Sequence, residues 1–476
     1  MKLALAATAP ATVEAPERLS PLERLEALCD PGTLRLLRTA VRRDARRSVP
    51  GDGVVAGAGL VAGRAVFCYA QDRSFMGGSL GSAQADTIVR VLRLAGDSGA
   101  PVVAFVESAG ARMDEGTAAL GGYGRIFREN VALSGRVPQV TVVCGTSAGG
   151  ASYSPALTDF VVMTDAAQMF LTGPDVVREV MGEQISKEEL GGPAVHSRNG
   201  VCQLVADGDV GGAGLARELL SYLPRHAGEA PPRELPEPPL PGDPSAAVPT
   251  ESRRVYDVRD VLGRLSDGGR LLELSPRFAA NVVTAYGRVE GRPVGFVANQ
   301  PRRLGGVLDA AAAEKAARFV NACDTWGLPL VVLVDTPGFL PGRRQEASGV
   351  IRHGAGLLRA FAAARVPKLT VVLRKAFGGG YITMNAKDLG ADLALAWPTA
   401  EIGVVGPRQA VTFVHRDELR RAADPARERE RLAAEYAERH VSADVAAREG
   451  FVDELVEPPE TRERIAWALE TLGGRR

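Results

Sequence analysis

The amino-acid sequence repeats itself once over most of its 476 residues, and this repeat limits the possible folds more than any other feature. Four pairs of segments match at offsets of 228 to 233 residues: Val54–Arg64 with Val282–Arg292, Pro101–Gly110 with Pro329–Gly338, Pro138–Gly150 with Pro367–Gly379, and Gly173–Pro174 with Gly406–Pro407. Solenoid arrays have periods of about 20 to 50 residues, so this period is too long for one. The repeat predicts two copies of one domain, with two similar sites or with one active and one decayed site.

The repeat, together with a Pro-rich segment between its copies, divides the chain into four parts. We expect an N-terminal helical extension over residues 1–48, a first domain over 49–225 and a second domain over 256–476. Between the domains, residues 226–255 contain PPRELPEPPLPGDP, which is typical of an extended linker. The Ala-rich start, Met1–Val13, predicts a frayed terminus rather than a signal peptide.

Short apolar runs alternate with Ala-rich helical segments in both copies. Runs such as Val102–Val106 and Leu330–Val334 are bounded by Pro and Gly, as buried strands often are. The segments Ala83–Gly96 and Ala310–Asp324 have helical composition, and each precedes a strand that begins with Pro. This alternation predicts the α/β class with a parallel sheet.

Charge and cysteine usage restrict the partners and the compartment. The chain has 57 basic and 57 acidic residues, so it lacks the positive balance of nucleic-acid-binding proteins. It has no uninterrupted apolar stretch of about 18 residues, which argues against a membrane-spanning helix. The five cysteines are scattered without a C-x-x-C pair, and the five histidines lack metal-ligand spacing. We expect a cytoplasmic protein without a metal, nucleic-acid or membrane partner.

Each copy has a glycine-rich turn directly after a predicted strand. The first turn contains Gly149 and Gly150, and the second contains Gly378, Gly379 and Gly380. Glycine allows positive φ and the close approach of a ligand, and the start of a helix presents unpaired amides. Two such amides can stabilise an oxyanion. A tight turn without a chemical role is the alternative at this point.

Other catalytic patterns are incomplete around these turns. The sequence contains no G-x-x-x-x-G-K-[ST] phosphate loop. Residues 145–149, GTSAG, match the letters of the G-x-S-x-G nucleophile elbow, with Ser147 at its centre. Ser147, Ser152 and Ser154 lie near the first turn, but no His is placed to activate them, which disfavours a serine nucleophile. Asp335 lies in turn-forming sequence, where capping is a more common role than catalysis.

At these residues the sequence resembles the carboxyltransferase β subunits of acyl-CoA carboxylases, of the propionyl-CoA and acetyl-CoA carboxylase type. The resemblance covers nearly the whole chain and rests on ordered blocks, among them Gly51–Val55, Gly77–Gly81, Ala148–Ala151, Tyr153–Phe160, Thr172–Val177, Val297–Pro301, Glu314–Val320, Pro337–Gly342, Ile351–Ala355, Arg374–Ala376 and Trp397–Ile402. It implies two tandem crotonase-like (ClpP/crotonase) domains from an internal duplication, in agreement with the repeat.

The resemblance also implies a reaction and its partners. Family members transfer the carboxyl group of carboxybiotin, which a biotin carboxyl carrier subunit holds, to the α-carbon of an acyl-CoA. Carried over to this sequence, Gly149 and Gly150 bind the thioester, and Gly379 and Gly380 bind biotin. The family further implies a biotin carboxylase subunit and a homohexamer, a trimer of dimers with the site shared between subunits. We expect biotin as cofactor and a short or medium acyl-CoA as substrate, without a metal.

A set of substrate-binding residues follows from the same resemblance. They are Gly77, Gly78, Ala111, Arg112, Ala151, Tyr153, Phe377, Tyr381 and Ile382. The sequence departs from the family's pattern at Gln84 and Thr87, where relatives commonly have His and Lys, and loss of the Lys is expected to weaken contact with the coenzyme A phosphates. Glu107 begins E-S-A-G-A-R where D-S-G-G-A-R is usual. Ile382 stands where propionyl-type relatives often carry Asp, which predicts a different acyl chain.

Two other functions remain open. A biotin-independent acyl-CoA decarboxylase or transcarboxylase of a specialised pathway would use the same turns, and a non-catalytic carboxylase-complex subunit would bind acyl-CoA or the biotin subunit without turnover. The sequence lacks an ATP-grasp pattern and an M-K-M biotinylation site, so another subunit must carboxylate and carry biotin. Arg416–His440, rich in Arg and Glu, predicts a solvated surface helix, with a partner-docking helix as the alternative.

Overall fold

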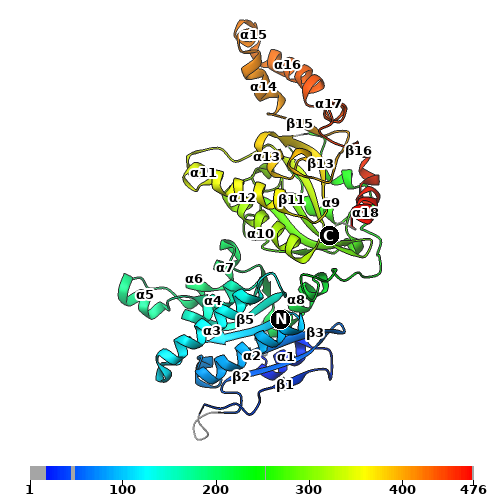
Figure 1. Cartoon of the computed structure of the whole chain (residues 1–476). Coiled ribbons are helices and arrows are strands. Elements are labelled where there is room, and N and C mark those ends of the chain that lie inside the picture. Colours follow the sequence, from blue (N-terminus) through cyan, green and yellow to red (C-terminus); the bar gives the residue numbers. More distant parts are fainter. Residues whose placement is uncertain (1–17, 44–48, 252–253, 474–476) are drawn as a thin grey trace, which may run out of the picture.

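The computed structural model describes residues 18–43, 49–251 and 254–473 of the chain. It contains two α/β domains, each built around an eight-stranded sheet, which are stacked in Figure 1. The predicted frayed terminus, Met1–Val13, lies outside the described residues.

The first sheet has the strand order β1-β2-β3-β4-β5-β6-β8, with β7 paired to the end of β5. Its strands are β1 (Arg35–Leu37), β2 (Val54–Val61), β3 (Arg64–Gln71), β4 (Val102–Ser108), β5 (Gln139–Ala148), β6 (Phe160–Thr164), β7 (Gln168–Phe170) and β8 (Leu204–Ala206). From β3 onward neighbouring strands are parallel, whereas β1 and β2 add an antiparallel edge. The predicted parallel sheet is confirmed for the centre of the domain.

The second sheet repeats this topology, with the order β16-β14-β13-β12-β11-β10-β9 and β15 paired to β13. Its strands are β9 (Leu272–Glu273), β10 (Val282–Val289), β11 (Arg292–Asn299), β12 (Leu330–Thr336), β13 (Lys368–Phe377), β14 (Leu393–Ala396), β15 (Glu401–Gly403) and β16 (Glu454–Leu455). The hairpin turns agree as well: φ is 48° and 73° at Ala62 and Gly63, and 51° and 71° at Glu290 and Gly291. Two left-handed residues suit a two-residue hairpin, and both copies use them.

Helices cover both faces of each sheet, because alternate residues of a strand point to opposite faces. On β3, Tyr69 joins the core beneath α2 and α3, whereas Cys68 and Ala70 join the core beneath α1 and α8. The helices of the first domain are α1 (Pro21–Leu28), α2 (Ser82–Ser98), α3 (Thr117–Leu133), α4 (Tyr153–Leu157), α5 (Pro174–Met181), α6 (Lys187–Gly191), α7 (Pro193–Asn199) and α8 (Gly208–Tyr222). Those of the second are α9 (Val258–Leu262), α10 (Ala310–Trp326), α11 (Arg343–Ala347), α12 (Val350–Ala363), α13 (Gly378–Thr383), α14 (Pro407–Val414), α15 (Arg416–Arg421), α16 (Pro425–His440), α17 (Ala443–Arg448) and α18 (Thr461–Leu472).

Helix α10 shows how local sequence sets these bounds. The Asp309 side chain accepts a hydrogen bond from the Ala312 amide and caps the first turn. Gly327, with a φ of 69°, ends the helix in the left-handed conformation. Ala316 and Phe319, spaced for one helical face, are buried against the sheet.

The two domains share one hydrophobic core. The fully buried Tyr286 ring of β10 contacts Phe160 and Tyr222 of the first domain and Phe319 of α10, with ring centroids 5.1 to 6.2 Å apart. Aromatic pairs of this kind contribute about 0.5–1.5 kcal/mol each beyond the burial of their area. This cluster fixes the two domains against each other.

The described part of the N-terminal extension belongs to the first domain. Ser20 and Glu23 form a capping box at the start of α1, which contacts β3 and α8. Strand β1 then pairs with β2 and lengthens the sheet.

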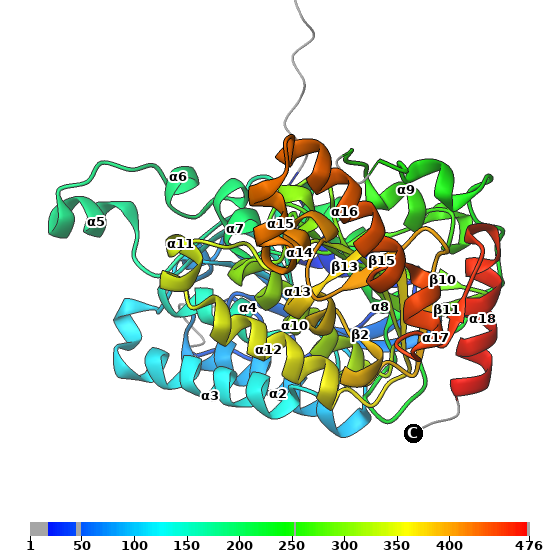
Figure 2. The same ribbon diagram turned by 90° about the horizontal axis from the view of Figure 1, so that it is seen from above.

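Helical arms project from both domains, as α5 and α6 in the first and α14 to α16 in the second (Figures 1 and 2). The segment Arg416–His440 forms two helices instead of one, because Asp424 caps a new helix that starts at Pro425. Most of its side chains are exposed, as predicted for a surface helix, while Leu419 and Leu432 enter a small core of the arm.

Candidate active site

Both glycine turns lie at the same point of their domains, where a central strand ends and a helix begins. Strand β5 ends at Ala148 and β13 at Phe377. The residues that follow, Gly149 and Gly378, have φ of 59° and 56°. A residue with a Cβ would be strained there by about 1–2 kcal/mol, so both turns depend on glycine.

The amides that open these helices are available to a ligand. The first amides of a helix have no acceptor within it, and neither Gly149 nor Gly150 donates to another described element. Gly378, Gly379 and Gly380 open α13 in the same way within the described chain. The repeat pairs Gly149 and Gly150 with Gly378 and Gly379, so the second turn has one further open amide. Both turns offer the donors that an oxyanion needs, and the assignment of the two holes stays a prediction.

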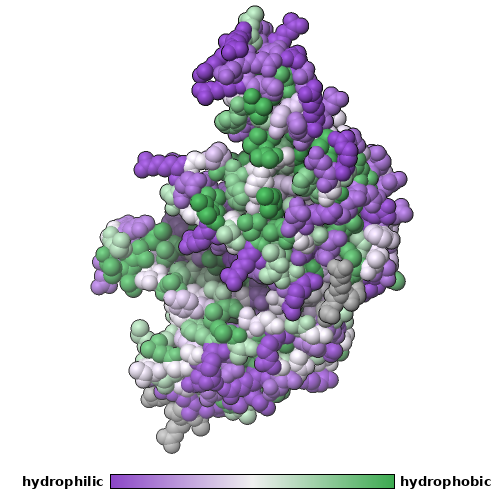
Figure 3. All heavy atoms as spheres, turned by 45° about the horizontal axis from the view of Figure 1, so that its top comes forward, coloured by the Kyte–Doolittle hydropathy of each residue, from purple (hydrophilic) through white to green (hydrophobic). Residues whose placement is uncertain are grey.

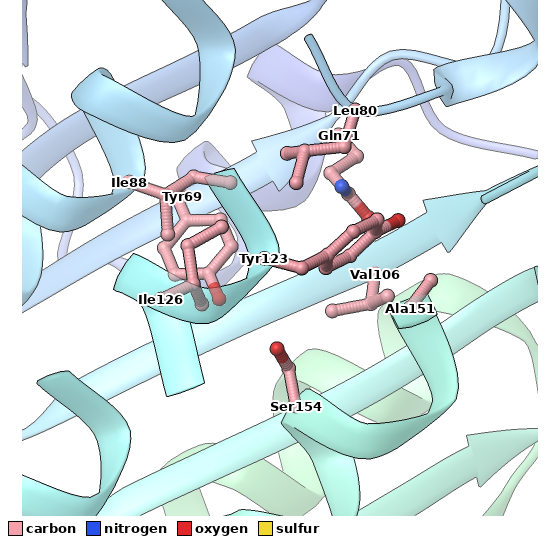
Figure 4. A pocket seen from close by; sticks show the side chains of 9 residues that line it. All are labelled: Tyr69, Gln71, Leu80, Ile88, Val106, Tyr123, Ile126, Ala151 and Ser154. Atoms are coloured by element: carbon pink, nitrogen blue, oxygen red, sulfur yellow. The ribbon is translucent and has the colours of Figure 1, made fainter. Parts of the chain in front are cut away.

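A wall of side chains stands behind the first turn. A Cβ on Gly150 would lie 2.9 Å from the Tyr123 ring, and burial raises the pKa of Tyr123 to about 12. Tyr123, Ala151 and Ser154 line a cavity of about 10 Å³ (Figure 4). Such a cavity has room for about one water molecule, which is too little for an acyl chain.

The second turn rests on the loop that follows β12. A Cβ on Gly380 would lie 2.6 Å from the Gly338 Cα, so glycine permits this close contact. A Cβ on Gly379 would meet nothing within 4 Å, so space beside this residue is open. Asp335, at the end of β12, is fully buried, 3.0 Å from an Arg374 nitrogen and 3.8 Å from Lys375 Nζ. Its observed contacts are ion pairs beneath the turn.

The predicted substrate loop with Gly77 and Gly78 lies beside the end of β4. Both glycines have positive φ, 65° and 72°, and so does Met76, with 53°. A Cβ on Gly78 would lie 2.1 Å from the Glu107 carbonyl oxygen, so the loop packs directly on the strand. The second domain repeats this loop at Leu304–Gly306, with φ of 50°, 66° and 79°. This second loop was not among the predicted site residues, although the 228-residue offset from Met76–Gly78 locates it in the sequence.

Arg112 is buried, and its guanidinium faces the protein interior. It donates to Asp52 Oδ2 at 2.9 Å and to the Ser79 carbonyl oxygen at 3.1 Å. Its neighbour Ala111 forms a parallel bridge with Leu80. Arg112 therefore supports the glycine loop from behind, and its contact with a substrate stays a prediction.

The remaining predicted residues flank the turns. Phe377 and Tyr381 are buried beside the second turn, and burial raises the pKa of Tyr381 to about 12. Ala151 is buried, whereas Tyr153 and Ile382 are 50% and 49% exposed. Tyr153 and Ile382 are counterparts in the repeat, so each turn is followed by one exposed side chain that a ligand can reach.

The two departures from the family's pattern near the first turn both point inward. Gln84 Nε2 donates to the Gly53 carbonyl oxygen at 2.7 Å, and Thr87 is 1% exposed. Arg38 Nε donates to Thr87 Oγ1 at 3.1 Å, and the Arg38 side chain is exposed. A positive charge from the N-terminal segment therefore lies beside the position that lacks the usual Lys.

Within the described ranges, no three His, Cys, Asp or Glu side chains come together as a metal site would require. All five cysteines are buried and free. Every helix of the described chain is too short or too polar to cross a membrane.

Comparison with known proteins decides the family. A family model of the carboxyl transferase domain matches residues 14–475. The chain belongs to the carboxyl transferase family. Among the members, the chain is 45% identical over 470 residues to a propionyl-CoA carboxylase carboxyltransferase subunit of Haloferax mediterranei, covering 96% of this chain and 91% of that protein. It is 41% identical over 474 residues to a methylmalonyl-CoA decarboxylase subunit alpha of Propionigenium modestum, covering 96% and 91%.

A solved structure of the family agrees with the fold. The transcarboxylase 12S crystal structure, described as a hexamer with methylmalonyl-coenzyme A bound, matches with a TM-score of 0.93 and 44% identity. The match covers 96% of this carboxyl transferase chain and 90% of the 12S chain. The predicted family and the predicted tandem crotonase-like domains are confirmed.

Proposed function

We propose that this carboxyl transferase moves a carboxyl group from carboxybiotin, presented by a separate carrier subunit, to the α-carbon of an acyl-CoA in the cytoplasm. The observation that carries the proposal is the duplicated turn, with open amides at Gly149–Gly150 and at Gly378–Gly380. Carboxyl transfer of this kind develops negative charge on two oxygens, and each turn is suited to one of them.

The chain's part in the proposed reaction is electrostatic. The amides of Gly149 and Gly150 bind the thioester oxygen as the α-carbon loses its proton, and those of Gly379 and Gly380 bind the ureido oxygen of biotin. When bound, carboxybiotin would supply the carboxyl group by cleavage of its C–N bond, together with the ureido nitrogen that accepts the α-proton. The new C–C bond then forms at the α-carbon, and no side chain has to act as nucleophile or base. One oxyanion donor is typically worth about 10²- to 10³-fold in kcat.

The proposed assembly is a homohexamer, a trimer of dimers that shares the site between subunits and works with a biotin carboxylase and carrier partner. The hexamer reported for transcarboxylase 12S supports this assembly. Val180 and Met181 of α5 are 72% and 74% exposed, and their repeat counterparts Phe413 and Val414 of α14 are 71% and 66% exposed. Figure 3 shows hydrophobic atoms on the projecting segment at left and at the base of the upper arm. Such exposed patches mark protein interfaces.

A reconstitution assay tests the proposed activity. The purified chain is mixed with a carboxylated biotin carrier and with acyl-CoAs of increasing length, and the carboxylated CoA product is measured by mass. The proposal expects product that depends on the carrier. Retained acyl-CoA binding without any product would contradict it and favour the non-catalytic function.

Decarboxylation is the second candidate, because a methylmalonyl-CoA decarboxylase subunit is 41% identical to this chain. It would use the first turn in the same way. Loss of carboxylate from malonyl-CoA or methylmalonyl-CoA without a biotin carrier, together with no transfer to acyl-CoA, would favour decarboxylation.

A further inference from the structure

A buried carboxylate lies against the strand that leads into each glycine turn, at equivalent positions of the two domains. Glu107 is the last residue but one of β4, and Asp335 is the last but one of β12. A Cβ on Gly145 would lie 2.1 Å from Glu107 Oε1, so this carboxylate sits directly on the strand that leads into the first turn. The repeat counterpart of Gly145 is Arg374, which donates from Nε and Nη2 to Asp335 Oδ2 at 3.0 Å each.

The arginine that pairs with the buried carboxylate comes from a different element in each domain. Strand β5 has Gly145 at the position of Arg374 in β13. In the first domain, strand β5 therefore supplies no arginine to pair with the buried carboxylate of Glu107. Arg24 of α1 takes this place: its Nη2 donates to Glu107 Oε2 at 3.0 Å, and its Nε donates to Asp209 Oδ2 at 2.9 Å. The side chains of Arg24, Glu107 and Asp209 are only 3–4% exposed.

The lengths of the two acidic side chains fit the different positions of their arginine partners. Glu107 is one methylene longer than Asp335, and its carboxylate reaches past Gly145 to helix α1. Arg18 and Arg73 also lie 3.1 and 3.3 Å from Glu107 Oε1, but they are 44% and 60% exposed. Exposed ion pairs contribute little, so Arg24 is the main counter-ion of the buried carboxylate.

We propose that Glu107 is a positioning residue of the first turn and that Arg24 of the N-terminal helix is its required counter-ion. This inference rests on the proposed carboxyl transfer. Through Gly145 the Glu107 side chain fixes the strand four residues before Gly149, and through its carbonyl oxygen the same residue supports the loop at Gly78. Without Arg24, Glu107 and Asp209 lose the buried guanidinium that neutralises both carboxylates, and they have to move toward water. A shift of about 1 Å at a reacting site can cost about 10²-fold in rate.

Removal of the arginine is the first test. In the reconstituted full-length enzyme, Arg24→Ala should lower kcat by about 10- to 100-fold at temperatures where circular dichroism shows a folded chain. Arg24→Lys should lower kcat less than Arg24→Ala does, but it should not restore kcat fully. A lysine keeps the positive charge, but it lacks the planar guanidinium that contacts Glu107 and Asp209 together. Arg462→Ala is the matched control: Arg462 pairs with the buried Asp267 at 2.6 Å, and this pair holds the Glu290–Gly291 hairpin instead of either glycine turn. It should lower the melting temperature and keep kcat.

Relocation of the arginine is the second test. The triple variant Arg24→Ala, Glu107→Asp and Gly145→Arg reproduces the arrangement of the second domain, and it should recover at least about tenfold of the kcat lost in Arg24→Ala. Where Arg24→Ala does not fold, a folded and active triple variant supports the inference, and an unfolded or inactive one overturns it. A folded Arg24→Ala with full kcat also overturns it. Absence of carboxyl transfer by the unmodified chain would instead contradict the proposed function.

Discussion

The glycine that begins each helix decides whether the turn can form. Gly378 has a φ of 56°, and a Cβ there would lie 2.8 Å from the Val404 carbonyl oxygen. Gly378→Ala should strain the turn by about 1–2 kcal/mol and lower kcat for carboxyl transfer by about tenfold or more. Gly124→Ala is the control, because a Cβ at this position of α3 meets nothing within 4 Å. Equal kcat values for the two variants would contradict the role of the turn.

The exposed residue after the second turn should influence the choice of acyl chain. Ile382 is 49% exposed on α13, and an apolar side chain favours an apolar ligand. Ile382→Asp should lower the ratio of kcat/KM for longer over shorter acyl-CoAs by about tenfold, measured in competition. Leu235→Asp, at an 88% exposed position of the linker, should leave this ratio unchanged. An unchanged ratio in Ile382→Asp would remove support for its role in specificity.

Residue types at the site could be predicted from the sequence, but the directions of side chains could not. The glycine turns were predictable because the repeat places them twice. The family resemblance predicts a substrate contact for Arg112, but it does not reveal the contact with Asp52, which lies 60 residues away and holds the guanidinium inward. No sequence pattern indicates the contact between Arg24 and Glu107, because the two residues lie 83 positions apart in the chain.

At the scale of elements, α10 is joined to the loop before β10 by a buried amine. Lys315 Nζ donates to the carbonyl oxygens of Ser275, Phe278 and Val282 at 2.7 to 3.0 Å. Lys315→Met leaves these buried carbonyls without their donor and should lower the free energy of unfolding by about 1–3 kcal/mol at neutral pH. Chemical denaturation of both proteins measures this difference.

The same lysine predicts a pH dependence. Burial lowers the pKa of Lys315 to about 8, from an ordinary value of 10.5. Between these two values the unfolded chain holds a proton that the folded chain has lost, so the free energy of unfolding should rise with pH in this window. The slope from one group is at most about 1.4 kcal/mol per pH unit, and it should be missing in Lys315→Met. Parallel curves for the two proteins would contradict this assignment.

Long elements with regular patterns could be predicted, whereas short ones could not. The runs Val102–Val106 and Ala310–Asp324 correspond to β4 and α10, each extended at its end by two residues. Strands β7 and β15 have only three residues, too few for a periodic signal. They form because the ends of β5 and β13 offer unpaired backbone groups, which is a tertiary effect.

At the scale of the whole molecule, the duplicated arms indicate how chains assemble. Leu171 of the first domain and Val404 of the second are exposed counterparts in the repeat, like the apolar pairs on α5 and α14. Exposed apolar surface promotes unspecific association. A duplication by itself therefore does not explain why apolar side chains are exposed at matching positions of both arms. We therefore expect another copy of the chain to cover both arms.

Charge placed on both arms tests this expectation. Val180→Glu combined with Phe413→Glu should convert a hexamer of 50.1-kDa chains into smaller species in analytical ultracentrifugation, since buried carboxylates without partners oppose association. The melting temperature should change little, because both side chains are exposed in the single chain. Leu235→Glu on the linker is the control and should leave the hexamer intact.

Activity should follow assembly in these variants. If each site is completed by a neighbouring subunit, the dissociated double variant loses carboxyl transfer although its glycine turns are unchanged, and higher protein concentration restores both hexamer and rate together. A dissociated variant with full kcat would show that one chain carries a complete site. A double variant that stays hexameric would show that the arms lie outside the interface, and the exposed residues on α5 and α14 would then need a different partner.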